Sequence, residues 1–167
     1  NDPNLGRLSE FTFHGVTMRP DAKVSNLIQK WKDLMKPLKQ PLCYTEITLK
    51  RDSSGDNTLH NIIVDSFKWI TKADVALVHV DGLRTKWNPG EITTLDLYNM
   101  FPFNNDICTF EMTGAELIQT LKDIVSTKFY SVSGLMVTYA RNPNKFISAL
   151  QYEGGKYKEI DLKKTYI

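Results

Sequence analysis

Two side chains in the middle of the chain, Arg84 and Phe103, have the chemistry to hold a flat polar ligand. Arg84 follows an apolar run and a Gly82 turn, and Phe103 follows a short predicted helix. A guanidinium fork can hold hydroxyl or phosphate oxygens with paired hydrogen bonds. An aromatic ring can stack on a base, which is worth about 1–3 kcal/mol per base. The ordinary alternatives are a surface ion pair for the arginine and a core position for the phenylalanine.

Histidines and cysteines do not form a metal-binding pattern. The three histidines, His14, His60 and His79, lie in different predicted elements without ligand spacing, so we predict no metal site in this chain. His60 is expected to face solvent from a helix. The two cysteines, Cys43 and Cys108, lie in apolar, β-prone stretches. We expect them to be buried free thiols, with a disulfide as the alternative.

Composition indicates a globular domain. The 167 residues are 41% hydrophobic, and 21 basic residues against 19 acidic ones give a net charge of +2. This balance does not favour nucleic acid as a partner, and the clustered lysines are spaced like solvated surfaces. No apolar run reaches the roughly 20 residues of a membrane span. Neither a signal peptide nor an Asn-X-Ser/Thr sequon is present, and the localisation stays undetermined.

The first part of the chain predicts a strand pair and a helix. Apolar residues alternate in part between Arg7 and Met18, with a break at Gly15. A helix then opens at Pro20 and Asp21, and Pro37 and Pro41 end it. Its apolar residues have the spacing of one helical face: Val24, Leu27, Ile28, Trp31, Leu34, Met35 and Leu38.

The middle of the chain alternates predicted strands and helices. A strand is expected over 43–49, a turn over 52–56, and a helix capped by Asn57 or Thr58. One face of that helix is predicted to carry Leu59, Ile62, Ile63, Phe67 and Ile70. The apolar stretch 73–80 predicts a central strand covered on both sides. A short helix over 94–100, capped by Thr93 or Thr94, follows.

Strands dominate the last part of the chain. A strand over 107–112 precedes a helix whose capping box is Thr113 with Glu116. Further strands are predicted over 135–139, 146–152 and 165–167, with a hairpin turn at Gly154 and Gly155. The fold class is therefore α+β, a mixed sheet with packed helices.

Several short motifs occur in the order found in the C-terminal domain of the 5'-nucleotidase family, which this chain resembles. That domain typically carries Leu-Gly-Asn-Leu on a helix, Asn-Gly-Gly-Gly-Ile-Arg after a strand, Gly-Glu-Ile-Thr, Leu-Pro-Phe-Gly-Asn, Leu-Thr-Gly and Val-Ser-Gly-Leu. The matching stretches here are Leu59–Ile62, His79–Arg84, Gly90–Thr93, Phe101–Asn105, Met112–Gly114 and Val132–Leu135.

The resemblance implies a division of the chain and a set of binding residues. Residues 1–41 would be the tail of a preceding metallophosphatase region with a linker helix. Residues 42–167 would be the C-terminal-like domain, truncated at its C-terminal end, so we expect a piece of a longer protein. The nucleoside or nucleoside monophosphate would be bound by Arg84, Phe103, Asn105, His79 and Gly134. The two divalent metals, such as zinc, and the catalytic residues would belong to the missing N-terminal domain.

The chain also departs from the family pattern near these residues. His79, Val80 and Asp81 stand where the family has asparagine and two glycines, and side chains there restrict the backbone and fill space. Gly55 stands where the family often has an arginine, which Arg51 could replace only if the loop folds back. A second stacking phenylalanine of the family would lie beyond Ile167.

Two functional hypotheses therefore stay open. In the first, the chain is the substrate-recognition domain of a 5'-nucleotidase-type phosphohydrolase, with family members mostly extracellular or periplasmic. In the second, it is a degenerate family member that serves as a structural or accessory subunit of a larger assembly, because function resides in sites grafted on a fold. The sequence leaves open whether the parent protein is an enzyme.

Overall fold

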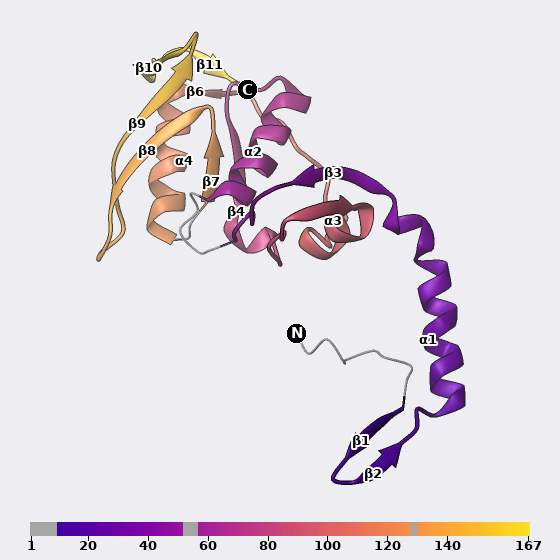
Figure 1. Cartoon of the computed structure of the whole chain (residues 1–167). Helices are drawn as coiled ribbons and strands as arrows, with labels where there is room; N and C mark the ends of the chain where they lie inside the picture. Colours follow the sequence, from indigo (N-terminus) through magenta and orange to yellow (C-terminus); the bar gives the residue numbers. More distant parts are fainter. Residues whose placement is uncertain (1–9, 52–56, 128–129) are drawn as a thin grey trace.

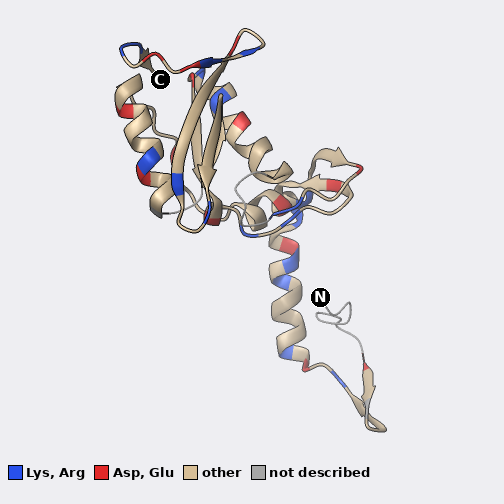
Figure 2. Ribbon diagram, turned by 90° about the vertical axis from the view of Figure 1, so that its left-hand side faces the viewer, with Lys and Arg blue, Asp and Glu red and all other residues tan. Residues whose placement is uncertain are grey.

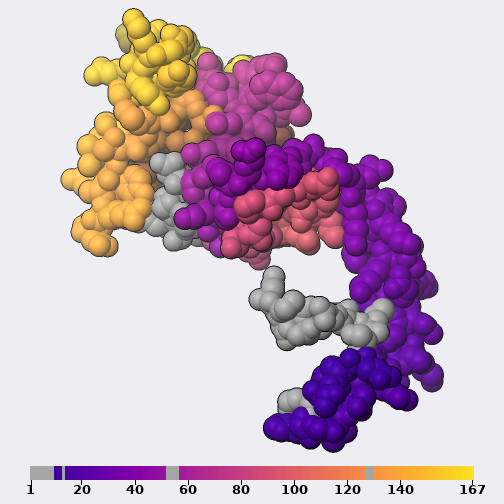
Figure 3. Space-filling view, in the orientation of Figure 1, coloured from indigo at the N-terminus to yellow at the C-terminus, as the bar shows by residue number. Residues whose placement is uncertain are grey.

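The chain folds into an α+β body from which an N-terminal arm projects, and the predicted fold class is confirmed. The computed structural model describes residues 10–51, 57–127 and 130–167. Figure 1 shows the hairpin and first helix of the arm extending away from the sheets and helices of the body. The space-filling view in Figure 3 shows the same separation between the hairpin and the body.

The arm consists of an antiparallel hairpin and one helix. Strands β1 (Phe11–Phe13) and β2 (Val16–Met18) pair, as predicted, and α1 spans Ala22–Leu34. Asp21 caps α1 because its Oδ1 accepts the backbone N–H groups of Lys23 and Val24. A 3-10 turn, η1 (Lys36–Lys39), leads into the body.

The apolar stripe of α1 is present, but it does not pack against the body. No side chain of α1, all of whose residues are described, is buried, and Leu27 and Trp31 are 56% and 58% exposed. Figure 2 shows the arm from a second side, with acidic and basic residues interspersed along α1. The predicted helical face is therefore real in its spacing and open to solvent here.

Helix α2 (Thr58–Thr71) packs on a face that differs from the predicted one. Asn57 is its N-cap, as predicted, and accepts the N–H of His60 at 3.2 Å. The buried positions are Leu59, His60, Ile63 and Val64, whereas Ile62 and Ile70 are exposed. The prediction of a solvent-facing His60 was wrong, because two polar partners satisfy its ring in the interior. The predicted turn over 52–56 lies outside the described residues.

Short strands pair around α2 in separate two-stranded sheets. Strand β3 (Pro41–Thr45) pairs antiparallel with β5 (Gly90–Thr93). Strand β4 (Ala76–His79) pairs antiparallel with β7 (Tyr130–Ser133), and within the described residues it has no second strand partner. The expectation of a central strand over 73–80 was therefore wrong for this structure.

The predicted strand over 107–112 is also largely absent. Only Met112–Thr113 (β6) is a strand, and it pairs antiparallel with β11 (Thr165–Tyr166). Ile107 and Phe110 are 45% and 68% exposed. Cys108 in this segment and Cys43 in β3 are free and exposed, so the prediction of buried thiols was wrong.

The C-terminal part follows the predicted pattern closely. Helix α4 (Gly114–Thr127) begins at the predicted capping box, in which Glu116 Oε2 accepts the Thr113 N–H and hydroxyl, both at 2.7 Å. These two bonds hold the pKa of the Glu116 carboxyl below its usual 4.5. Strands β8 (Leu135–Ala140), β9 (Lys145–Glu153) and β10 (Lys156–Glu159) form an antiparallel sheet. The predicted Gly154–Gly155 turn joins β9 to β10, with both residues at positive φ.

Two apolar cores stabilise the body. One lies between α4 and the β8–β9 sheet and contains Leu117, Leu121, Leu135, Ala149, Ile160 and Tyr166. The other lies around α2 and α3 (Thr94–Met100), which Thr93 caps as predicted, and contains Leu49, Leu59, Ile63, Leu83 and Met100. Because Leu83 and Met100 are completely buried, this second core anchors the two segments that carry Arg84 and Phe103.

Candidate functional site

The turn after β4 is held against the end of α3. Strand β4 ends at His79, a 3-10 turn, η2 (Val80–Gly82), follows, and Leu83 enters the second core. The backbone N–H of Arg84 donates to the carbonyl of Met100 at 2.7 Å. This bond and the buried Leu83 bring the turn beside the segment 101–105, so two stretches distant in sequence form one surface.

Arg84 and Phe103 lie side by side on that surface. The guanidinium carbon of Arg84 is 5.4 Å from the centre of the Phe103 ring, and the ring is 42% exposed. Phe101 contacts the same ring edge-on, with centroids 6.2 Å apart and an interplanar angle of 88°. A base stacked between guanidinium and ring would need about 7 Å, twice the ordinary contact distance. Stacking therefore requires the other ring face or a movement of Arg84.

Asn105 lies two residues beyond Phe103 on the same segment, which has no regular secondary structure, and its side chain is exposed. It is thus on the same stretch of chain as the predicted stacking ring. Three of the five predicted binding residues, Arg84, Phe103 and Asn105, belong to the surface formed by the turn and the segment after α3.

Arg51 also reaches this turn. Its Nε donates to the carbonyl oxygen of Leu83, and its Nη2 lies 3.8 Å from Asp81 Oδ1. The sequence gave Arg51 this place only if the preceding loop folded back, and the structure shows that contact. The Asp81 carboxylate, absent from the family pattern, therefore has a cationic neighbour, and Arg84 Nη1 donates to the Asp81 carbonyl at 3.4 Å.

Two histidines support the turn from opposite sides. His79 Nδ1 accepts the backbone N–H of Asp81 at 3.1 Å, and the ring lies edge-on to Tyr130 at 5.0 Å. His79 Nε2 is buried and has no hydrogen-bond partner in the part of the chain that the structure describes. His60 Nε2 lies 3.0 Å from the carbonyl of Val80, and its Nδ1 lies 2.8 Å from Asn57 Oδ1. The sequence gave no signal for this role of His60.

Gly134 lies apart from the other predicted binding residues. It follows β7, whose Ser133 pairs with Ala76, whereas His79 pairs with Tyr130 at the opposite end of the same ladder. Its φ is +81°, and a Cβ there would overlap the carbonyl oxygen of Asp74 and lie 2.8 Å from Lys68 Cε. Close packing and backbone conformation thus account for a glycine here, and its binding role stays a prediction.

Metal-binding and membrane-spanning features were also examined in the described ranges. Among these residues, no group of three or more His, Cys, Asp or Glu side chains is placed to hold a metal ion. No helix formed by them is long and apolar enough to cross a membrane. The chemistry of the surface around Arg84 is therefore hydrogen bonding, charge and stacking.

The fold and this surface are those of a nucleotidase-type C-terminal domain. The family model described as 5'-nucleotidase, C-terminal domain, matches residues 32–167. The chain belongs to the 5'-nucleotidase family through this C-terminal domain.

Relatives of known sequence are much longer than this chain. It is 28% identical to the endonuclease YhcR of Bacillus subtilis, over 89% of this chain and 12% of that protein. It is 27% identical to a 5'-nucleotidase-related protein of Glossina morsitans morsitans, over 93% of this chain and 34% of that protein. The chain thus spans about a third or less of these two relatives.

Solved structures share the fold. The 5'-nucleotidase precursor of Thermus thermophilus superposes with a TM-score of 0.75 at 22% identity, over 89% of this chain and 33% of that one. The NAD nucleotidase of Haemophilus influenzae superposes with a TM-score of 0.66 at 22% identity, over 89% of this chain and 31% of that one. At this identity the likeness establishes the fold.

Proposed function

We propose that this domain recognises the nucleoside part of a nucleoside phosphate for a 5'-nucleotidase-type phosphohydrolase. The observation that carries the proposal is the pairing of an exposed Arg84 with the half-exposed Phe103 ring on a surface anchored by the second core. Phe103 offers the stacking surface for the base. Arg84 and Asn105 offer donors for ribose or phosphate oxygens.

In this proposal, the domain orients the substrate and the chemistry occurs elsewhere. Residues 1–41 would connect to a preceding metallophosphatase domain, where two divalent metals, such as zinc, would activate water and clamp the phosphate. Holding the nucleoside end fixed lowers the entropic barrier to that attack. Arm helix α1, with its exposed apolar stripe, would be part of the connection.

The second candidate function is that of a non-catalytic accessory subunit. Asp81 favours it, because its carboxylate lies in the turn where the ligand's oxygens would approach, paired with Arg51 at 3.8 Å. A negative charge beside Arg84 weakens the attraction of a phosphate to this surface. In that case the fold would serve protein partners and the surface around Arg84 would bind no nucleoside.

A thermal-shift titration separates the two candidates. Adenosine and adenosine monophosphate are added to the chain, and a ligand present at a hundred times its Kd stabilises the folded state by about 2.7 kcal/mol. We expect Arg84→Ala to remove the shift. Arg141→Ala, which alters another exposed arginine between β8 and β9, should retain it. A folded protein with no shift at millimolar ligand would favour the accessory role.

A further inference from the structure

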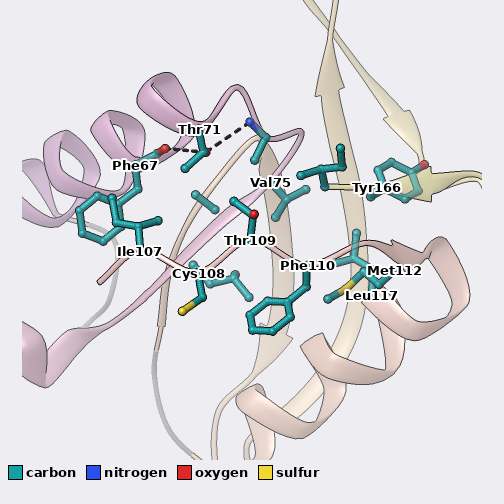
Figure 4. Close-up of a pocket in the computed structure, with 14 residues that line it drawn as sticks. Phe67, Thr71, Val75, Ile107, Cys108, Thr109, Phe110, Met112, Leu117 and Tyr166 are labelled. Carbon is teal, nitrogen blue, oxygen red and sulfur yellow. Dashed lines mark hydrogen bonds between the residues drawn. The ribbon is translucent and has the colours of Figure 1, made fainter. Parts of the chain in front are cut away.

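A narrow apolar cavity separates β4 from the extended segment 107–111. Its volume is about 200 Å³. Figure 4 shows its walls: Phe67 and Thr71 from α2, Val75 before β4, Thr109 from the extended segment, and Tyr166 from β11. On one side the lining residues run from Val75 to Leu77, and on the other they run from Met112 back to Ile107. The cavity is therefore a slot between two stretches of extended chain, with Ile167 at one end.

The backbone on one side of the slot is the continuation of an existing ladder. Strands β6 and β11 pair antiparallel with Tyr166 opposite Met112, and Gly114 N–H donates to the Lys164 carbonyl at 2.9 Å. Hydrogen-bonded pairs alternate along an antiparallel ladder. Because Gly114 is in such a pair, the next ones toward the N-terminus are Met112, Phe110 and Cys108. The ladder stops after Met112, and the N–H groups of Phe110 and Cys108 are left facing the slot.

The backbone on the other side is reached by Ile167. The Ile167 carbonyl accepts the N–H groups of Asp74 and Val75 at 2.6 and 3.2 Å, and its own N–H donates to Asp74 Oδ2 at 3.3 Å. The alternation explains this direction, since Ile167 is opposite Glu111 in a pair without hydrogen bonds and its polar groups face away. Ile167 is thus positioned between the two walls, bonded to one and aligned with the other.

We propose that the slot is an acceptor for one β-strand, and that the occupant is the stretch of polypeptide following Ile167 in a longer form of this protein. The strand enters antiparallel to 107–111 and alongside β4. It joins the β6–β11 and β4–β7 pairs into one continuous sheet. This inference concerns folding and is independent of nucleoside binding.

The chemistry of the slot specifies the side chains of the occupant. Tyr166 is 1% exposed and packs into the core beside Leu117, so alternate residues after it point the same way. The first and third residues after Ile167 must therefore be apolar. The added strand also covers Ile107, Phe110 and Ile167, which are 45%, 68% and 48% exposed here, and removes the unpaired edge of β4.

The same strand accounts for two predictions that failed. The sequence predicted a strand over 107–112 and a central strand over 73–80, and both are now without a partner on the side that faces the slot. Their alternating and apolar residues have the pattern of paired strands. Both failures have one cause if the strand between them is the missing element.

Amide hydrogen exchange measured by NMR tests the proposal. The present chain is compared with the same chain extended by the ten or so residues that follow Ile167 in the parent protein. We expect exchange at Phe110 and Cys108 to slow by about 100-fold, as for amides that enter a ladder. The amide of Thr109, which faces away from the slot, is the internal control and stays in the fast class.

A matched variant keeps the test specific. In it, the first and third added residues are replaced by aspartate, which leaves the length unchanged, and the amides of Phe110 and Cys108 should exchange as fast as in the present chain. Unchanged rates in the natural extension would overturn the proposal. So would an equal slowing at Thr109, which indicates general compaction, or a parent protein whose chain stops at Ile167.

Discussion

Replacing Gly134 by alanine should destabilise the domain far more than the same change at Gly155. The two glycines have nearly equal φ values, +81° and +80°, and therefore share the cost of a left-handed alanine. That cost is about 1–2 kcal/mol, reduced by about 0.4–1 kcal/mol because alanine lowers the entropy of the unfolded chain. Around Gly155 no described atom lies within 4 Å of the added Cβ, so Gly155→Ala should cost only about 1 kcal/mol.

At Gly134 the added methyl group has nowhere to go. It overlaps the Asp74 carbonyl oxygen, and the Lys68 side chain at 2.8 Å can move aside more easily than the backbone can. Overpacking of this kind adds about 1–3 kcal/mol. Gly134→Ala should therefore destabilise the domain by about 2–4 kcal/mol in total.

Urea denaturation of the two variants and the unchanged chain measures the difference. We expect the midpoint of Gly134→Ala to fall well below that of Gly155→Ala at an unchanged m-value. Equal midpoints would refute the packing argument. If Gly134→Ala kept its stability and lost nucleoside binding, the glycine would instead contact the ligand, as the family resemblance implies.

Three further predictions concern the supports of the body. His60→Leu leaves the Val80 carbonyl and the Asn57 side chain without partners in the interior and should cost about 1–3 kcal/mol in a urea titration; a loss below about 0.5 kcal/mol would contradict the role given to His60. Thr93→Ala removes the cap of α3, where Thr93 Oγ1 accepts the Asp96 N–H at 3.3 Å, and should cost about 1 kcal/mol, whereas Thr94→Ala, inside the helix, should cost less. The Glu116 carboxylate has a lowered pKa, so its contribution to stability is present above its usual pKa of 4.5 and is lost as the pH falls through the lowered value. The melting temperatures of the unchanged chain and Glu116→Gln should therefore converge below pH 4.5, and a constant difference down to strongly acidic pH would contradict the capping box as the cause.

Local signals predicted the parts of the fold that depend on neighbouring residues. The caps at Asn57, Thr93 and Thr113 follow from side chains that bond backbone groups two or three residues away. The turn at Gly154 and Gly155 follows from the positive φ that a tight hairpin requires. These features need no partner from another part of the chain, which is why the sequence alone predicts them.

Features that depend on distant partners could not be predicted in this way. His60 is buried because the carbonyl of Val80, twenty residues away, meets its ring. The contact of Arg51 with Leu83 and Asp81 depends on tertiary packing that no local pattern encodes. The spacing of apolar residues predicted α1 correctly, but spacing does not tell whether a partner covers the face.

The candidate site was predicted in part. The resemblance placed Arg84 and Phe103 near one ligand, and the structure brings their side chains within 5.4 Å through the bond between Arg84 and Met100. The distance between Gly134 and this surface was not evident, because a motif match gives residue identity without the direction in which a strand runs. Strand pairing between β4 and β7 sets that distance.

The most direct test of nucleoside recognition is the NMR signal of the Phe103 ring during a titration with adenosine. If the base stacks on this ring, its proton resonances should shift upfield and saturate, and the shift should be lost in Arg84→Ala. Rings that lie elsewhere, such as Tyr139 in β8, should not respond. A titration to millimolar adenosine that leaves the Phe103 resonances in place would contradict the account.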